Sequence, residues 1–128
     1  MDIEHLTFAK GPERVGPFSH AVRARDFLFV TGQMPTLPDD PTTLVSGDIE
    51  DQTRAVMENL KTVLVAAGSS LERVVFARVY LVNFQDFDRM NAVYASYFAA
   101  DRLPARTCIG VTGLAVGALV EIDLVAAA

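Results

Sequence analysis

Residues 48–68 have the pattern of one long amphipathic helix. Its apolar side chains recur on one face at helical spacing: Ile49, Val56, Leu60, Val63, Leu64 and Ala67. Asp48 is suited to cap the first turn, where Glu50 and Asp51 favour the positive end of the helix dipole. Gly68 supplies the left-handed residue at which such a helix ends. A helix of about twenty residues is roughly 30 Å long, and its apolar face needs one face of a small sheet to cover it.

Period-two patterns on both sides of this helix predict that sheet. The predicted strands cover residues 21–25 and 27–31, as a hairpin that turns at Asp26, then residues 74–82, 106–111 and 119–125, with one more at 3–8. A second helix is predicted over residues 86–100, and Pro104 prevents it from continuing. Its aromatic and apolar stripe is expected in the core or at an interface: Phe87, Met90, Tyr94, Tyr97 and Phe98. The Pro-rich residues 35–43 are predicted to be a turn-rich surface loop.

The order of these elements predicts a two-layer α+β domain over residues 1–128, with both helices on one face of a mixed sheet. In the strand over residues 74–82, the side chains expected to face the helices are those of Val75, Ala77, Val79 and Leu81. In the last strand they are those of Val120, Ile122 and Leu124. Glu121 and Asp123 then lie on the opposite face. Two carboxylates on a mixed face suit a subunit boundary or a cleft better than a core.

The composition indicates in which compartment the chain works and which partners it binds. Hydrophobic residues make up 51% and charged residues 21%, which is more apolar than a compact monomer of this size needs, so a homo-oligomer is predicted. A net charge of −5 argues against a nucleic-acid partner. A single cysteine, and an N-terminal MDIEHL with neither a basic nor an apolar leader region, favour the cytoplasm. The apolar runs are too short to span a membrane.

Arg106, Cys108 and Glu121 are the residues whose chemistry stands out. Period-two alternation places Arg106 and Cys108 on one face of their strand, and Glu121 is expected on its partner strand. An arginine on a strand is a rigid two-pronged donor for a carboxylate, and a nearby glutamate can orient or deprotonate water. A structural ion pair between Arg106 and Glu121 explains the same two residues equally well.

Cys108 also raises the question of covalent or metal chemistry. It could be a nucleophile with His20 or His5 as its base, but a lone cysteine in a strand is more often a small packing residue, and we favour packing. Two histidines and one cysteine without close spacing make a poor ligand set, so no metal site is predicted.

Six ordered segments form a further pattern: GPFSHAV at 16–22, FVTGQ at 29–33, GDIEDQTRAVMENLKTVLVAAGSS at 47–70, MNAVYASYF at 90–98, PARTC at 104–108 and GALVEIDLVA at 117–126. Through these segments, and above all through PARTC followed by VEI, the chain resembles the Rid/YjgF family of enamine and imine deaminases. The resemblance implies a chorismate-mutase-like fold in which three subunits pack their sheets into a barrel-like centre, with a ligand cleft at each interface.

The resemblance also implies an activity. Reactive enamines of the 2-aminoacrylate type, or 2-imino acids, would be hydrolysed to 2-keto acids and ammonia. No cofactor is implied, because a protonated imine is already electrophilic and water is the nucleophile. Arg106 would hold the substrate carboxylate, the backbone near Cys108 would contact the imine nitrogen, and Glu121 would position the attacking water.

The resemblance places four further residues at this cleft. Thr31 and Gly32 would line it, and Asn91 would enter it from the second helix of a neighbouring subunit. Phe18 would keep a ring in the pocket where the family usually has the tyrosine of GPYS, and so loses a hydroxyl donor. His20, which replaces the glutamine that follows this motif, adds a group that titrates near neutral pH. These two departures bear on the substrate range.

Other functions fit the same features. A trimeric small-ligand-binding protein of the same fold, without catalysis, is one alternative, and a pathway-specific deaminase of another enamine is a second. Chorismate mutase activity is disfavoured, because its dicarboxylate substrate would require several convergent cations and only Arg106 is designated for the cleft.

Overall fold

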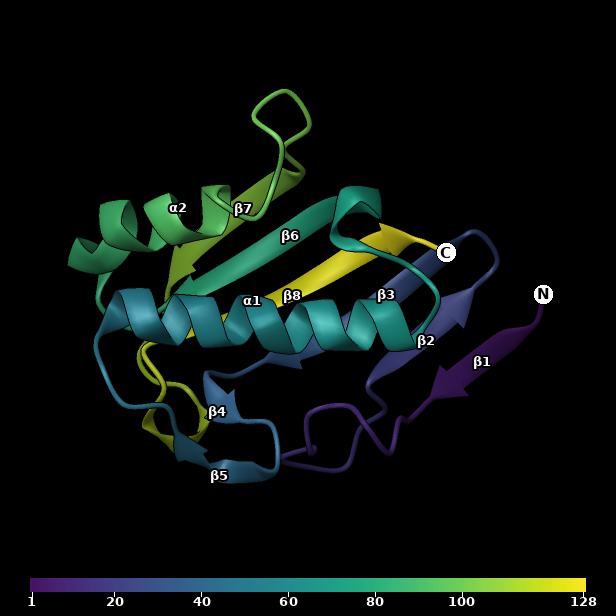
Figure 1. The fold of residues 1–128 in the computed structure, drawn as a ribbon, viewed down its shortest axis with the longest axis horizontal. Coiled ribbons are helices and arrows are strands. Elements are labelled where there is room, and N and C mark those ends of the chain that lie inside the picture. Colours follow the sequence, from purple (N-terminus) through teal and green to yellow (C-terminus); the bar gives the residue numbers. More distant parts are fainter.

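The computed structural model describes residues 1–128 as a six-stranded sheet with two helices (Figure 1). The order across the sheet is β1 (Ile3–Leu6), β2 (Ala21–Ala24), β3 (Phe27–Gln33), β8 (Val120–Ala127), β6 (Val74–Leu81) and β7 (Ala105–Gly110). Only β6 and β7 pair in parallel, because the chain between them returns through α2 (Phe87–Ala95). All other neighbouring strands are antiparallel.

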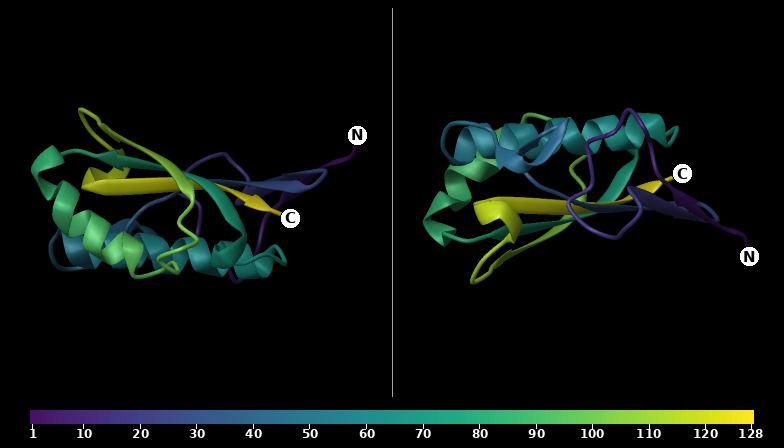
Figure 2. Two further views of the ribbon diagram at one scale, coloured as in Figure 1. Left: turned by 90° about the horizontal axis from the view of Figure 1, so that it is seen from above. Right: turned by 90° about the horizontal axis from the view of Figure 1, so that it is seen from below.

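Both helices cover the same face of the sheet, as Figure 2 shows. α1 (Ile49–Ala66) packs on β8 and β3, and α2 packs beside α1. The core between the layers contains Leu60 and Leu64 from α1 and Ile122 from β8, all fully buried. Each such side chain stabilises the fold by about 1.5–3 kcal/mol. The predicted two-layer α+β architecture is confirmed, as is the inward alternation along β8.

The ends of α1 lie where the sequence predicts them. The Asp48 carboxylate accepts from the backbone of the first turn, and the amide of Asp48 donates to the Asp51 carboxylate, so the two residues form a capping box. Gly68 follows the last turn with φ +82°, a conformation that side chains with a Cβ rarely adopt. Arg89 of α2 donates to Glu50 at 2.9 Å and also bonds Asp48, which ties α2 to the start of α1.

A β-bulge in β6 changes which side chains at the start of this strand face the helices. The pairing with β8 shifts between Val74 and Phe76, so one extra residue is inserted there. Val74 is consequently buried and Val75 is 45% exposed, opposite to the prediction for Val75, while Ala77 and the residues after it alternate as expected.

Two further segments differ from their predictions. The Pro-rich segment is not only a loop, because residues within it form a small hairpin of β4 (Thr36–Leu37) and β5 (Asp40–Leu44). Asn59 of α1 supports this hairpin by donating to the carbonyls of Met34 and Thr36. α2 ends at Ala95, short of the predicted residue 100, since the next amides bond three residues back and tighten the chain into turns.

The face of the sheet away from the helices has no cover within the chain. Phe27 and Phe29 of β3 are about half exposed on it. Arg78 of β6 donates through two nitrogens to Asp123 of β8, at 2.9 Å each. A shallow hollow of about 460 Å³ lies over β3, β6 and β8 on this face, and it is lined by both apolar side chains and this ion pair. We call it the open face.

Candidate functional site

Arg106 lies on the helix side of the sheet. It pairs in register with the fully buried Ala77, and its side chain points toward α2. Its Nη1 donates to Oδ1 of Asn91 at 2.7 Å. Its guanidinium carbon lies 4.9 Å from the ring centre of Tyr94 and 5.7 Å from that of Phe87. The cation is therefore held by one amide and two rings, all from α2.

Cys108 follows two residues later on the same side of β7, half-buried beside Val79. Burial raises the pKa of its thiol, and the nearby Arg106 offsets only part of that rise. His20 lies just before β2, four strand spacings from β7, which is about 19 Å. His5 on β1 is one strand farther away. Neither histidine can serve as a base for Cys108 within the chain, so a packing role fits this cysteine.

Glu121 lies on β8 and belongs to the open face. It pairs with Tyr80 of β6, and burial raises the pKa of its carboxyl, with repulsion from Asp123 adding to the rise. Gly32 of β3 approaches it very closely, since a Cβ built on Gly32 would lie 2.1 Å from Oε2 of Glu121. Only a glycine at position 32 leaves the carboxylate in this place.

Thr31 and the loop before β2, which carries Phe18, lie next to Gly32. The Thr31 hydroxyl donates to the carbonyl of Ser19 at 2.6 Å, and the Thr31 amide donates to the carbonyl of His20. These bonds fix the loop against β3. Phe18 lines a small pocket together with Gly32. Phe18, Thr31 and Glu121 thus each lie beside Gly32.

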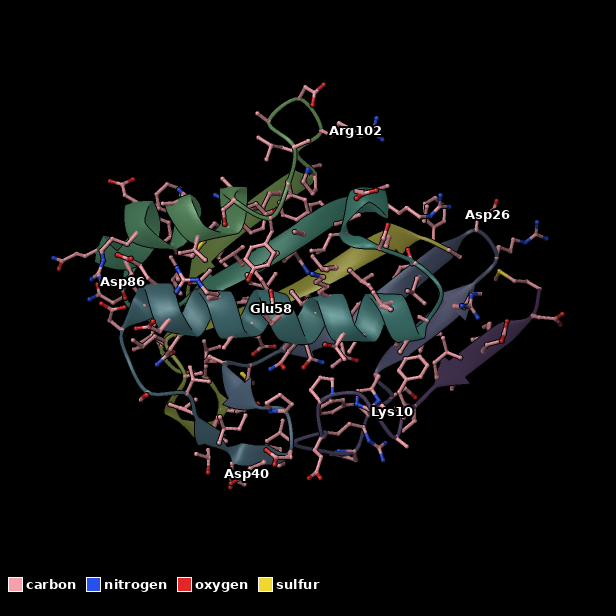
Figure 3. The ribbon with its side chains drawn as sticks, viewed as in Figure 1. Lys10, Asp26, Asp40, Glu58, Asp86 and Arg102 are labelled. Carbon is pink, nitrogen blue, oxygen red and sulfur yellow. The ribbon has the colours of Figure 1, made fainter.

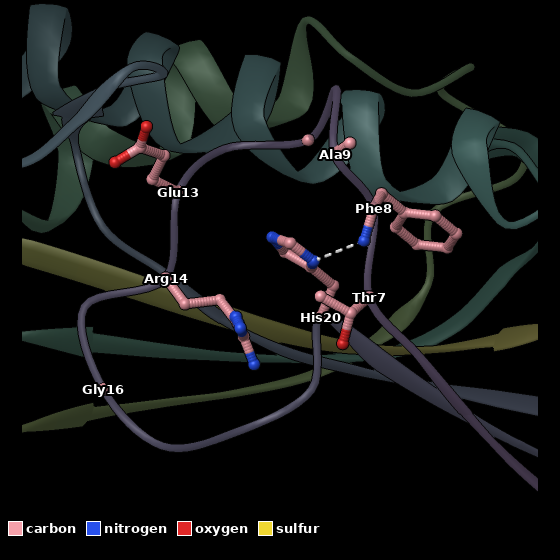
Figure 4. A pocket seen from close by; sticks show the side chains of 8 residues that line it. Thr7, Phe8, Ala9, Glu13, Arg14, Gly16 and His20 are labelled. Atoms are coloured by element: carbon pink, nitrogen blue, oxygen red, sulfur yellow. Dashed lines mark hydrogen bonds between the residues drawn. The ribbon is translucent and has the colours of Figure 1, made fainter.

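His20 has a structural role that the sequence did not reveal. Its Nδ1 accepts from the amide of Phe8 at 3.0 Å (Figure 4), so its Nε2 donates to the carbonyl of Pro12. The ring is 3% exposed and stacks on Phe8. A hollow of about 580 Å³ in this N-terminal loop is lined by His20 and by Arg14. Since both of its ring nitrogens are hydrogen-bonded to the backbone of this loop, His20 holds the loop in place.

The prediction that Glu121 lies on the strand next to that of Arg106 is wrong. β6 lies between β7 and β8, and the two side chains project from opposite faces of the sheet. The sequence does not reveal this order, because β8 enters the sheet between β3 and β6 and leaves β7 at the edge. A structural ion pair between Arg106 and Glu121 within one chain is excluded as well. Asn91 was expected from a neighbouring subunit, but it bonds Arg106 of its own chain.

The site residues therefore form two groups on one chain. The helix-side group contains Arg106, Asn91 and Cys108, and the open-face group is the one around Glu121. No three or more His, Cys, Asp and Glu side chains are grouped so as to hold a metal ion. The first group offers a fixed cation to a carboxylate, and the second offers a carboxylate that accepts a proton readily.

The sequence of the chain matches a known protein family. The sequence model of the family described as Endoribonuclease L-PSP matches residues 8–128. The chain belongs to the Rid/YjgF family. The resemblance inferred from the six segments is thereby confirmed.

Members of the Rid/YjgF family resemble this chain over nearly its whole length. A RutC family protein of Pyrococcus horikoshii is 47% identical over 117 residues, which are 90% of each chain. The crystal structure of RidA from an Antarctic Psychrobacter species has a TM-score of 0.90 and 31% identity, covering 98% of this chain and 99% of that one. E. coli TdcF with bound serine has a TM-score of 0.87 and 28% identity, covering 98% of both chains.

Proposed function

We propose that this Rid/YjgF protein hydrolyses 2-imino acids and the enamines that precede them, giving 2-keto acids and ammonia. The observation that carries the proposal is the mounting of Arg106, whose guanidinium is held by Asn91 and two aromatic rings and keeps free donors. A 2-imino acid has a carboxylate next to the reacting carbon, so a fixed arginine fork holds both in place. The serine bound to TdcF has the same carboxylate next to a carbon that bears nitrogen, which supports this substrate class.

Glu121 is the proposed proton acceptor. Water adds to the carbon of the protonated imine while Glu121 takes one of its protons, which gives a neutral carbinolamine. Glu121 returns this proton to the nitrogen. As the C–N bond breaks and ammonia leaves, the hydroxyl proton of the carbinolamine passes to Glu121, which gives the keto acid, and Glu121 then releases this proton to solvent. The raised pKa of Glu121 suits both steps, because a carboxylate with a higher pKa is a stronger base and its acid remains a usable donor.

The cleft is proposed to form between two copies of the chain, within a trimer. Arg106 and Glu121 cannot meet in one chain, since they lie on opposite faces of the sheet. The open face carries half-exposed Phe27 and Phe29, an apolar surface of the kind that meets another subunit. RNA cleavage, which the family description names, is not proposed, because the net charge of −5 repels phosphate backbones.

The test generates 2-iminopropionate and longer imino acids from amino acids with an oxidase, and follows their decay with and without the protein. Faster decay is expected, with loss of the effect in Arg106→Ala and in Glu121→Gln. Arg102→Ala is the matched control, since Arg102 lies at the tip of the exposed loop between α2 and β7 (Figure 3) and its loss should leave the rate unchanged.

Two further measurements address the shared cleft. Light scattering should give a mass near three times 13.9 kDa. Mixing the inactive Arg106→Ala and Glu121→Gln variants under subunit exchange should restore activity, because one chain then supplies the arginine and another the glutamate. A stable monomer, or an unchanged rate of imine decay with every substrate, would overturn the proposal. Binding of a keto acid without any faster decay would instead indicate the non-catalytic binding protein.

A further inference from the structure

One stripe of α2 surrounds the Arg106 guanidinium. Phe87, Asn91 and Tyr94 are spaced four and three residues apart, so they share one face of the helix. All three contact Arg106, the first and last through their rings and Asn91 through its amide oxygen. The structure shows no other side-chain hydrogen bond and no ion pair for this arginine, so the amide and ring contacts of its guanidinium all come from α2.

Of the two rings, that of Tyr94 lies closer to the Arg106 guanidinium. It is 3% exposed, and Phe98 packs on it with ring centres 5.0 Å apart. Its hydroxyl is buried without any hydrogen-bond partner, although burial raises its pKa and keeps it a donor. A buried hydroxyl without a partner destabilises a fold. The ring packs on Phe98 and lies near the Arg106 cation, so the ring, and not the hydroxyl, accounts for the contacts that this side chain makes.

Asn91 determines which donors of Arg106 stay free. A guanidinium has five N–H groups, and Asn91 accepts from Nη1. The edge formed by Nε and Nη2 has no partner in the chain, and its two parallel N–H groups match the two oxygens of a carboxylate. A ring at 4.9 Å also attracts the cation and limits its swing away from this position.

We propose that Tyr94 is a positioning residue, whose ring, together with Asn91, fixes the Arg106 guanidinium so that its Nε and Nη2 edge receives the substrate carboxylate. This inference rests on the proposed function and adds to it. The ring acts through Arg106 and not through the reacting atoms. Its loss therefore affects carboxylate binding more than the proton transfers at Glu121.

The experiment compares Tyr94→Leu with Tyr94→Phe. Phe keeps the ring and removes the unpartnered hydroxyl, so it should match the parent in kinetics and melt no lower. Leu keeps an apolar core residue without a ring, and KM should rise about 3- to 30-fold, the range expected for losing a cation–ring contact, with a smaller change in kcat. Val63→Ala is the matched control, because it removes buried apolar volume from α1 and should lower the melting temperature without raising KM.

A binding measurement separates positioning from general damage. Calorimetry with pyruvate, and with its uncharged amide, measures how much of the affinity comes from the carboxylate. This preference for pyruvate should fall in Tyr94→Leu and stay at the parent value in Tyr94→Phe and Val63→Ala. Should Tyr94→Leu fail to fold, Asn91→Ala serves in its place, since Asn91 is only half-buried and its loss frees Nη1. Asn91→Ala should also reduce the preference for pyruvate over its amide.

The outcomes distinguish this inference from the proposed function. If the parent neither speeds imine decay nor binds pyruvate, the proposed function fails. If the parent does both, and Tyr94→Leu and Asn91→Ala keep its KM and its preference for pyruvate, only the positioning role is overturned. Equal losses in Tyr94→Phe and Tyr94→Leu would also overturn it, because they would assign the effect to the hydroxyl.

Discussion

Gly32→Ala should disable the site while leaving the fold in place. The added methyl would lie 2.1 Å from Oε2 of Glu121, whereas ordinary contact begins at 3.4 Å, so the carboxylate must withdraw by about 1.3 Å, the difference between the two. The backbone of Gly32 is not in the left-handed region, so alanine adds no backbone strain there. A displacement of about 1 Å at a catalytic group costs on the order of 100-fold in rate.

The assay for this variant is kcat/KM on imino acids generated in situ, with thermal melting measured in parallel. Gly113→Ala is the matched control, because a Cβ at Gly113 meets nothing within 4 Å. In a Glu121→Gln background the same methyl should cost far less, since the proton acceptor is already lost. A Gly32→Ala protein with the parental kcat/KM would refute the role given to the Glu121 carboxylate.

Three other substitutions test the remaining roles. Arg106→Lys should lose about 10- to 100-fold in kcat/KM with assembly intact, because an ammonium cannot bond Asn91 and offer two parallel donors as well; parental kinetics would contradict this. Cys108→Ala should keep most of the activity, since burial raises the pKa of the thiol and keeps it protonated; inactivation by both the alanine and a thiol-alkylating reagent would require a cysteine mechanism. Glu121→Gln should raise the melting temperature at pH 7.5 but not at pH 3.5. The raised pKa of Glu121 makes its ionisation oppose folding as the pH rises above 4.5, and below that value the group is protonated in both states. An equal effect at both pH values would show that charge is not the cause.

Local signals in the sequence are sufficient for α1 and for the alternation along β8. Asp48 and Gly68 lie next to the residues that they cap, so the bounds of α1 could be predicted within a few residues. The inward residues of β8 were predictable for a similar reason, because alternation needs no knowledge of the neighbouring strand. The bulge at Val75 depends on the register with β8, which no local pattern encodes.

The relative placement of the candidate site residues depends on features that no local pattern in the sequence encodes. Sequence patterns designated Arg106 and Glu121, but their relative placement depends on the strand order, which is decided by packing between distant segments. Asn91 was assigned to a neighbouring subunit, although it bonds Arg106 of the same chain through the return of α2 over β7. The contacts of His20 with Phe8 and Pro12 depend on the path of an irregular loop, which has no period to follow.

The separation of Arg106 and Glu121 by the thickness of a sheet restricts the symmetry of any assembly in which they meet. A two-fold dimer uses the same patch on both chains, so one partner would have to reach both sides of the sheet at once. A head-to-tail contact avoids this, because each chain turns its arginine side to one neighbour and its glutamate side to another. Such contacts either continue as a filament or close into a ring. Only in a closed ring does every chain have both neighbours, so the number of complete clefts equals the number of chains.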